Sequence, residues 1–281
     1  MIFEFRQKKI ICNRTYLIGI LNVTPDSFSD GGKFFSHDKA FKHAIKMLNE
    51  GADIIDIGGE SSRPGSKPID ATTELNRIIP IVKMLRKEYP DAIISIDTTK
   101  YLVAKAALEA GADIINNING LRNSQNIAPL CAEFNAGLIL MHMRGTPATM
   151  REHCFYDNLI DDIKNELAFS IKIATDSGVN MQNIILDPGI GFAKNTSQNL
   201  EIIKNWTKLK ELKRPILIGH SKKSFIGDST EVKLPEDRLP ATCALSFYLA
   251  MQGVDFLRVH DVKENLQAVK MAKILGEKCL S

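Results

Sequence analysis

The stretch Leu21-Asn-Val-Thr-Pro-Asp-Ser-Phe-Ser-Asp-Gly-Gly32 follows an apolar run at residues 16–21 that predicts a buried strand. From Pro25 onward it consists mainly of turn formers, so the strand gives way at once to a polar loop. Asn22 stands at this junction. Open α/β sheets and barrels place their chemistry at the carboxyl ends of their strands. We therefore expect Asn22 to belong to a functional site, and the rest of the chain repeats this arrangement.

Further short apolar runs rich in Ile, Leu and Val lie along the chain, at residues 53–57, 92–96, 113–118, 137–141, 183–186, 215–218 and 254–259. They show no clean alternation, which is typical of parallel strands buried on both faces. Segments with helical spacing separate them, at residues 37–50, 70–88, 100–110, 123–135, 156–178, 197–210, 235–252 and 262–275. Glycines stand just past four of these helices, at the expected C′ positions: Gly51, Gly111, Gly178 and Gly253.

Eight βα units in 281 residues predict one (β/α)8 TIM barrel in the α/β class, forming a single domain over residues 1–281. A doubly wound sheet is the alternative, and the number of strands argues against it. Residues 51–53 and 111–113 both read Gly-Ala-Asp before a strand, which supports a repeated unit. Residues 2–5 and 10–12 predict a short N-terminal β-hairpin that plugs the bottom of the barrel.

The composition excludes several classes of function. The net charge is +3 and Lys and Arg are dispersed, which argues against a nucleic-acid partner but allows a site for a small anion. The five cysteines form no Cys-x-x-Cys pair, so reduced thiols are expected rather than disulfides or zinc. No signal-peptide core and no run long enough to span a membrane is present. We expect a cytoplasmic protein with no membrane partner.

Polar side chains at the predicted strand ends form two groups. The first comprises Asp97, Asn116, Asp187 and Lys223. Burying them in one mouth is costly unless a ligand matches them, and they suit a flat heterocycle with adjacent donors and acceptors. The second is cationic, with neutral polar neighbours: Arg63, Arg258, His260, Asn22, Ser62 and Ser221. It favours an anion site, and no P-loop or G-x-G-x-x-G motif indicates a nucleotide.

Each residue also has a structural alternative. Asp97 could be the N-cap of the next helix. Asp187 precedes Pro188 and Gly189 and could form a turn. Asn116 could satisfy backbone groups in a bend. For His142, a hydrogen-bonded position in the wall is favoured over catalysis.

Six stretches resemble the signatures of the dihydropteroate synthase family in the family's order, over nearly the whole chain. They are residues 21–32, Asp56-Ile-Gly-Gly-Glu-Ser-Ser-Arg-Pro-Gly65, Ser95-Ile-Asp-Thr-Thr-Lys100, Met141-His-Met-Arg-Gly145, Asp187-Pro-Gly-Ile-Gly-Phe192 and Arg258-Val-His-Asp261. The resemblance implies a (β/α)8 barrel that joins 6-hydroxymethyl-7,8-dihydropterin diphosphate to p-aminobenzoate and releases diphosphate. It also implies a Mg²⁺ cofactor and a homodimer.

The resemblance implies three overlapping sets of site residues. The pterin set is Asp97, Asn116, Asp187 and Lys223. The diphosphate set is Asn22, Ser62, Arg63, Arg258 and His260, with Mg²⁺ on Asn22. The p-aminobenzoate set is Phe28, Ser62, Pro64, Phe192, Ser221 and Lys223. We assign catalytic roles to Asp97, Lys223 and Arg63.

Four positions depart from the family pattern: Ser62 stands for Thr, Lys222 for Arg, Asn117 for a frequent Asp and His220 for a small or apolar residue. Ser62 keeps the hydroxyl. Lys222 cannot make the bidentate fork of Arg, which puts an anion or stacking role there in doubt. The alternatives are a pterin-binding barrel for methyl transfer from methyltetrahydrofolate and a non-catalytic pterin-binding homologue. The loops at residues 24–32 and 61–67, with Arg258 and His260, argue against the first alternative, and the full set of polar strand ends argues against the second.

Overall fold

A computed structural model describes residues 1–24 and 33–276 of the chain. It contains a parallel sheet with the order β8-β7-β6-β5-β4-β3-β10-β9. A further parallel bridge joins Leu186 to Ile216 and closes the sheet into a barrel. The strands are β3 (Tyr16–Asn22), β4 (Ile54–Gly58), β5 (Ile93–Asp97), β6 (Ile114–Asn117), β7 (Gly137–Met141), β8 (Ile184–Asp187), β9 (Leu217–Ile218) and β10 (Phe256–Val259). The predicted (β/α)8 barrel is confirmed.

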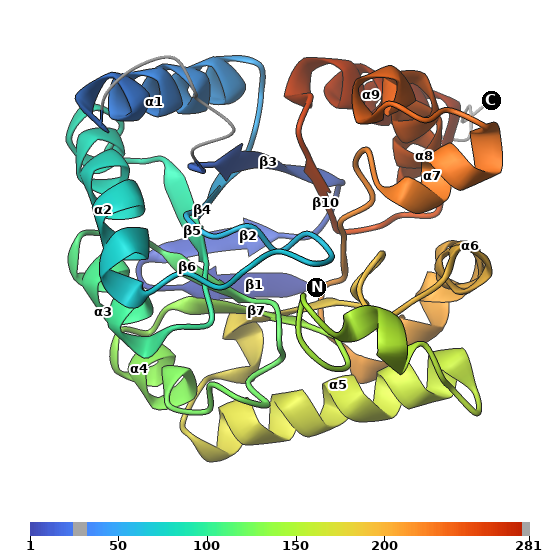
Figure 1. Cartoon of the computed structure of the whole chain (residues 1–281), viewed down its shortest axis with the longest axis horizontal. Helices are drawn as coiled ribbons and strands as arrows, with labels where there is room; N and C mark the ends of the chain where they lie inside the picture. Colours follow the sequence, from blue (N-terminus) through green and yellow to red (C-terminus); the bar gives the residue numbers. More distant parts are fainter. Residues whose placement is uncertain (25–32, 277–281) are drawn as a thin grey trace.

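Helices surround the strands in a ring (Figure 1). They are α1 (Lys33–Asn49), α2 (Ala71–Glu88), α3 (Tyr101–Glu109), α4 (Ile127–Glu133), α5 (Leu159–Asp176), α6 (Thr196–Asn205), α7 (Ser224–Thr230), α8 (Leu239–Met251) and α9 (Val262–Gly276). All eight predicted helices occur, with shorter bounds for most of them. The structure also contains α7, which the sequence pattern did not predict, because a seven-residue helix is too short to show a repeat.

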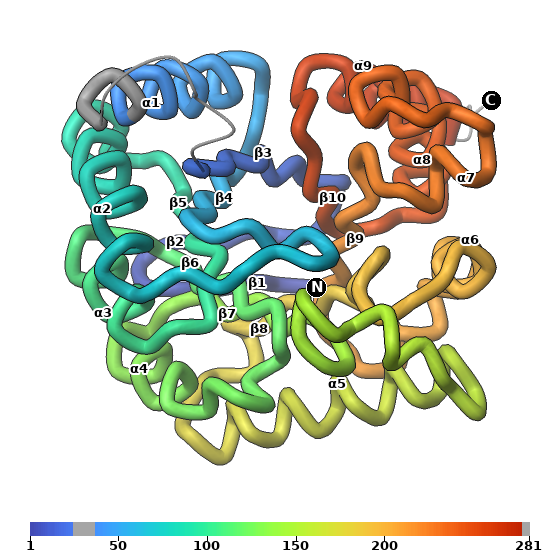
Figure 2. The backbone as a smooth tube through the Cα atoms, viewed as in Figure 1, coloured from blue at the N-terminus to red at the C-terminus, as the bar shows by residue number. Residues whose placement is uncertain are grey.

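The N-terminal hairpin of β1 (Ile2–Phe5) and β2 (Lys8–Ile11) crosses the middle of the ring of helices (Figure 2). Phe3 and Phe5 are fully buried. They form an apolar cluster with side chains from all eight barrel strands: Ile18, Ile54, Ile93, Ile114, Ile139, Ile185, Leu217 and Phe256. The hairpin therefore plugs the amino-terminal end of the barrel, as predicted.

The predicted C′ glycines explain how the helices end so close to the following strands. Gly51, Gly111, Gly178 and Gly253 have φ of +100°, +104°, +93° and +72°. A side chain in this left-handed region costs about 1–2 kcal/mol, which Gly avoids. The barrel strands all pair in parallel, so the strand carboxyl ends meet at the end opposite the hairpin. No helix within the described residues has the length and apolar content to cross a membrane.

Candidate active site

The register of the sheet brings four of the strand-end positions to one level. Asn22 lies opposite Gly58, Gly58 opposite Asp97, and Asp97 opposite Asn116. A Cβ at Gly58 would lie 3.8 Å from both Asn22 Oδ1 and Asp97 Oδ2. Gly58 therefore leaves a gap between the amide of Asn22 and the carboxylate of Asp97. The predicted meeting of polar side chains at one mouth is confirmed for these strands.

Arg258 joins the two predicted groups of residues. Its Nε donates to Asp56 Oδ2 at 2.6 Å and its Nη2 donates to Asp97 Oδ2 at 3.0 Å. Asn116 Nδ2 also donates to Asp56 Oδ2, at 2.9 Å. Asp56 is fully buried, and its other carboxylate oxygen has no hydrogen-bond partner among the described residues. The sequence analysis missed Asp56, although a charged residue inside an apolar strand is the signal that could have found it.

Asp97 lies in a strongly perturbed electrostatic environment. Burial, opposed by the charge of Arg258 and assisted by the charge of Asp56, raises the pKa of Asp97 to about 7. Asp97 does not cap the following helix α3, whose N-cap is Lys100 without a side-chain hydrogen bond. The N-cap alternative for Asp97 is therefore wrong. Its carboxylate instead faces the mouth, where it can respond to charge on a ligand.

Asp187 and Lys223 lie on the other side of the mouth, and among the described residues they form no ion pair with each other. Burial raises the pKa of Asp187 and lowers the pKa of Lys223 to about 8. Asp187 Oδ1 accepts from Gly189 N at 2.7 Å, so this residue does form a turn as well. Gly219 separates Asp187 from Arg258, because a Cβ there would lie 3.7 Å from Asp187 Oδ2 and 3.8 Å from Arg258 Cβ.

The loop after β8 packs against Lys223. Lys223 Nζ donates to the carbonyl of Ile190 and lies 4.5 Å from the centroid of the Phe192 ring. Gly191 makes this approach possible, since a Cβ there would lie only 3.0 Å from Lys223 Cδ. The structure thus brings together Lys223 and Phe192, as the sequence analysis expected. A flat ring could lie beside this cation and aromatic pair.

Cations surround His260 at the rim. Its backbone N–H donates to Ser221 Oγ at 3.2 Å, and its Nδ1 lies 3.0 Å from the same hydroxyl. Burial, followed by the charges of Arg258, Lys222 and Arg63, lowers the pKa of His260 to about 4. An anion bound here would offset this positive field. The predicted cationic group is therefore assembled around His260.

Ser62, Arg63 and Pro64 lie on a surface loop beside this group. Ser62 is half-buried, and Arg63 and Pro64 are exposed. Glu60, at the start of the loop, binds its far end, because Glu60 Oε1 accepts from Ile69 N at 2.8 Å. Glu60 Oε2 accepts from Lys100 Nζ at 2.5 Å, which fixes Glu60 to the segment after β5. Phe28 lies outside the described residues.

The departures from the family pattern have local explanations. Lys222 Nζ pairs with Asp261 at 2.8 Å. His220 is fully buried, with Nε2 at 2.9 Å from Ser246 Oγ of α8, so it ties β9 to that helix. The side chain of Asn117 accepts from Leu121 N and donates to the buried Ser124 Oγ, each at 2.9 Å. These three residues support the loops behind the mouth.

Two further expectations concern residues in the wall of the barrel. His142 is buried and hydrogen bonded on both ring nitrogens, by Glu166 at 3.0 Å and Lys194 at 3.0 Å, which confirms the expected wall position. Asn116 binds a side chain rather than backbone in a bend, so that alternative is wrong. The sequence analysis missed Lys194, a buried lysine beside the mouth whose pKa is lowered by burial to about 7.

A cavity of about 530 Å³ lies at the opposite end of the barrel, lined by the hairpin and by residues 180–183. Its cations are already engaged: Lys8 pairs with Asp113 at 3.0 Å, and Arg6 donates to the carbonyl of Leu108 at 2.8 Å. The strand carboxyl ends remain the candidate active site, because they gather buried carboxylates of raised pKa and several cations around one mouth.

Comparison with known proteins agrees with this geometry. The profile of the family described as pterin binding enzyme matches residues 18–260. A dihydropteroate synthase of Clostridium beijerinckii is 47% identical over 266 residues, covering 94% of this chain and 96% of that protein.

Solved structures are similar over nearly the whole chain. The dihydropteroate synthase of Clostridium difficile in the presence of pteroic acid has a TM-score of 0.88 and 43% identity, covering 97% of this chain and 98% of that one. The Xanthomonas albilineans enzyme with 4-aminobenzoic acid has a TM-score of 0.91 and 34% identity, covering 98% of each chain.

The chain therefore belongs to the pterin-binding enzyme family. The matched residues, 18–260, include the carboxyl ends of all eight barrel strands. Within this family its activity is that of a dihydropteroate synthase, a transferase of folate biosynthesis. The resemblance inferred from the sequence is confirmed.

Proposed function

We propose that this enzyme condenses 6-hydroxymethyl-7,8-dihydropterin diphosphate with p-aminobenzoate to 7,8-dihydropteroate and diphosphate, at the carboxyl ends of the barrel strands. The observation that carries the proposal is the buried Asp97–Arg258–Asp56 arrangement beneath the cationic group around His260. It offers charged acceptors for a heterocycle deep in the mouth and cations for an anion at its rim. The two ends of a pterin diphosphate need these two environments.

The pterin would occupy the inner part of the mouth, between Asp97, Asn116, Asp187 and Lys223. Asp187 Oδ2 makes no hydrogen bond among the described residues, so it can accept a donor of the ligand. Lys223 can donate to a ring carbonyl. Carboxylates accept parallel N–H bonds from an amidine-like edge, which suits the pterin ring. The related Clostridium difficile structure was determined in the presence of pteroic acid, a compound with a pterin ring.

The diphosphate would lie at the rim, held by Arg63, Arg258 and His260 with Ser62 and Ser221. Among the described residues no group of three or more His, Cys, Asp or Glu side chains could hold a metal. Asn22, whose amide oxygen borders the gap above Gly58, would be the protein ligand of Mg²⁺, an ion that commonly takes few protein ligands beside phosphate and water. When bound, Mg²⁺ would neutralise charge on the diphosphate.

The reaction follows from these placements. Arg63, Arg258 and His260 stabilise the negative charge that develops as the bond between the pterin methylene carbon and the diphosphate oxygen breaks. The bonding electrons leave with diphosphate. The methylene cation is delocalised into the pterin, and the Asp97 carboxylate stabilises it. The amine of p-aminobenzoate then forms the C–N bond and loses a proton to water. No nucleophilic side chain is required.

The p-aminobenzoate would lie at the outer edge, bordered by Ser62, Pro64, Phe192, Ser221 and Lys223, with Phe28 from the first loop. The contact between Phe192 and Lys223 supports this placement, since an aromatic ring can pack against both. The related Xanthomonas albilineans structure contains 4-aminobenzoic acid.

We further propose a homodimer formed through α8 and α9. Helix α8 is apolar on nearly all sides, whereas an apolar helix is normally covered. Exposed apolar side chains extend over both helices: Tyr248, Met251, Met271, Ile274 and Leu275. Light scattering should give twice the mass of one chain, and Tyr248→Lys should shift the protein toward the monomer. A monomeric wild-type protein would contradict this.

We also propose a cytoplasmic location. The four cysteines within residues 1–24 and 33–276 are free thiols: Cys12, Cys131, Cys154 and Cys243. Free thiols suit a reducing compartment. Fractionation of the producing cell, with thiol labelling of the purified protein, tests this proposal.

A diphosphate-release assay tests the proposed function. We expect release with the pterin diphosphate and p-aminobenzoate together, at a rate that depends on p-aminobenzoate. A methyl-transferring pterin barrel or a non-catalytic homologue would release no diphosphate under these conditions, so absence of release would refute the proposal.

A further inference from the structure

The loop after β8 carries Phe192 in a conformation that the local sequence does not favour. Gly189, Gly191 and Ala193 have φ of 71°, 78° and 51°. Glycine tolerates these values, but Ala193 has a side chain and does not adopt such a backbone readily. A Cβ at Gly189 would meet the carbonyl oxygen of His142 at 1.9 Å. Contacts with side chains must therefore hold its shape.

Two side chains bind the carbonyl groups on either side of Ala193. Lys194 Nζ donates to the carbonyl of Phe192 at 2.8 Å. The Tyr156 hydroxyl donates to the carbonyl of Ala193 at 2.9 Å. These two bonds fix the peptide groups on either side of Ala193 and so orient the ring of Phe192. That ring lies 4.5 Å from the ammonium of Lys223, within the proposed substrate site.

Lys194 is buried and, among the described residues, forms no ion pair. Its second contact is with His142 Nδ1 at 3.0 Å, and His142 Nε2 lies 3.0 Å from Glu166 Oε2. A carboxylate only accepts, so the ring proton is on Nε2 and Nδ1 accepts from Lys194. Burial lowers the pKa of His142 to about 3, consistent with a neutral ring.

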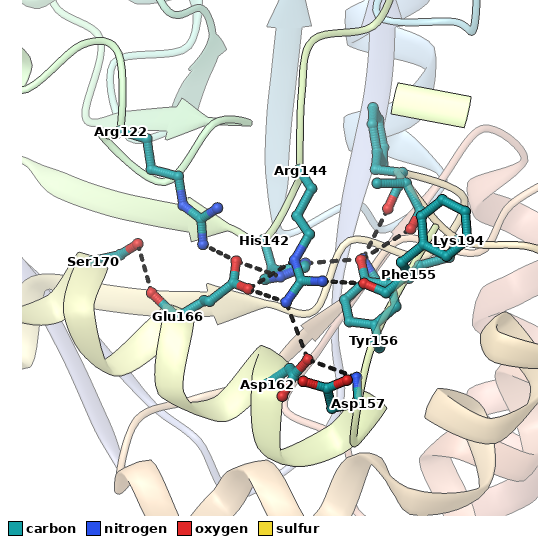
Figure 3. A network of polar contacts seen from close by, with 12 residues as sticks. Arg122, His142, Arg144, Phe155, Tyr156, Asp157, Asp162, Glu166, Ser170 and Lys194 are labelled. Atoms are coloured by element: carbon teal, nitrogen blue, oxygen red, sulfur yellow. Dashed lines mark hydrogen bonds and ion pairs between the residues drawn. The ribbon is translucent and has the colours of Figure 1, made fainter. Parts of the chain in front are cut away.

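Glu166 anchors this chain of hydrogen bonds (Figure 3). Its carboxylate accepts from Arg122 and Arg144 as well as from His142, and these side chains converge on it. The three donors hold the pKa of Glu166 well below its usual range despite burial. The negative charge of Glu166 therefore persists and, through His142, keeps Lys194 directed at the loop.

We propose that Lys194 is a positioning residue for the arylamine substrate. It acts through Phe192, whose carbonyl it binds and whose ring it thereby keeps beside Lys223. A methionine would fill the same space without the penalty of burying an ammonium, so packing alone does not explain a lysine here. The inference rests on the proposed function, which places p-aminobenzoate against Phe192 and Lys223.

Steady-state diphosphate release by the full-length enzyme tests this inference. Lys194→Met removes the donors at similar volume, Lys194→Gln keeps two N–H donors, and Arg122→Met is the control. The control removes one of the donors to Glu166 but leaves both contacts of Lys194. We expect Lys194→Met to raise the KM for p-aminobenzoate about tenfold, the effect of one charged hydrogen bond. Its kcat and its KM for the pterin diphosphate should stay within about twofold.

Lys194→Gln should recover part of the lost affinity, and Arg122→Met should lower the melting temperature without changing the KM for p-aminobenzoate. The inference is overturned if Lys194→Met leaves that KM unchanged, alters all kinetic constants alike, or is matched by Lys194→Gln.

If Lys194→Met does not fold, Tyr156→Phe gives the second test. It removes only the hydroxyl at the Ala193 carbonyl and should raise the same KM about threefold, from loss of one neutral hydrogen bond. An unchanged KM would overturn the inference. A wild-type enzyme that releases no diphosphate would instead refute the proposed function, so the two failures are distinguishable.

Discussion

At the amino-terminal end of the barrel, the buried carboxylate of Asp113 accepts from Lys8 at 3.0 Å, from Arg86 at 2.7 Å and from Ile94 N at 2.9 Å. At the carboxyl end, Asp187 forms no ion pair among the described residues, and Asp56 keeps one carboxylate oxygen without a partner. Both ends belong to one barrel and bury charge. Among the described residues, the Asp113 carboxylate at the hairpin end is paired with two cations, whereas the Asp187 carboxylate at the other end is paired with none.

This difference shows which end is built for stability and which for a ligand. At the hairpin end, Phe3 and Phe5 fill the barrel and the ion pairs close around them. At the other end, buried groups remain incompletely paired, and an unpaired buried polar group costs about 1–3 kcal/mol. A substrate that brings its own donors and anion can remove this cost. The predictions below compare the two ends, from the largest expected effect to the smallest.

Asp97→Asn should have the largest effect. It keeps the size of the side chain but removes the charge that stabilises the cation, so kcat should fall about 1000-fold. Asp113→Asn at the hairpin end should leave kcat intact and lower the free energy of unfolding by about 3 kcal/mol, because it breaks a buried ion pair. Turnover assays and melting curves measure both. Near-normal turnover of Asp97→Asn would show that the charge of Asp97 does not stabilise the cation.

Asp187→Ala should weaken pterin binding about 100-fold, because the ligand loses a charged acceptor. Calorimetric titration of a pterin analogue into the folded variant measures this. An unchanged affinity would leave Asp187 only its observed role in the turn at Gly189.

Lys223→Ala should lower kcat/KM at least tenfold, because the cation beside Phe192 is lost. Lys222→Ala should change it less than threefold, since Lys222 is paired with Asp261. Measuring kcat/KM for both variants compares two adjacent lysines directly. Equal losses would assign Lys222 to the substrate site as well.

Binding order sharpens the comparison within the mouth. Calorimetry should show p-aminobenzoate binding about tenfold or more weakly to the free enzyme than to the enzyme with Mg²⁺, diphosphate and a pterin. The anion gives Ser62 and Arg63 a partner and the pterin supplies one wall of the pocket, so both pre-organise the site. Equal affinity in the two conditions would indicate a preformed pocket.

The smallest effect concerns stability and pH. The pKa of Asp97 is raised from 3.8 to about 7 in the folded protein. A raised folded pKa gives stability that is fully present below pH about 4 and is lost as pH rises through about 7. Asp97→Asn removes this loss, so its melting temperature relative to wild type should rise by a few degrees from pH 4 to pH 8. A constant difference would mean an ordinary pKa for Asp97.

The tertiary structure revealed features that local pattern cannot contain. Arg258 pairs with Asp56, 202 positions away, only because β10 and β4 are brought to the same mouth when the barrel closes. Lys194 was missed for the same reason, since it lies in the loop after β8 and its partner His142 follows β7, 52 positions away. Helix α7 gave no signal because its Gly227 and its short polar residues have low helix propensity.

The sequence by itself determined the order of strands and helices, the glycine C′ positions and the residues at the strand carboxyl ends. These follow from periodicity and turn chemistry, which act between near neighbours. Only the tertiary structure decided which of those residues bind one another and which keep an unused donor or acceptor. Hydrogen bonding and desolvation depend on distances of a few ångströms between groups far apart in the chain, and folding alone sets those distances.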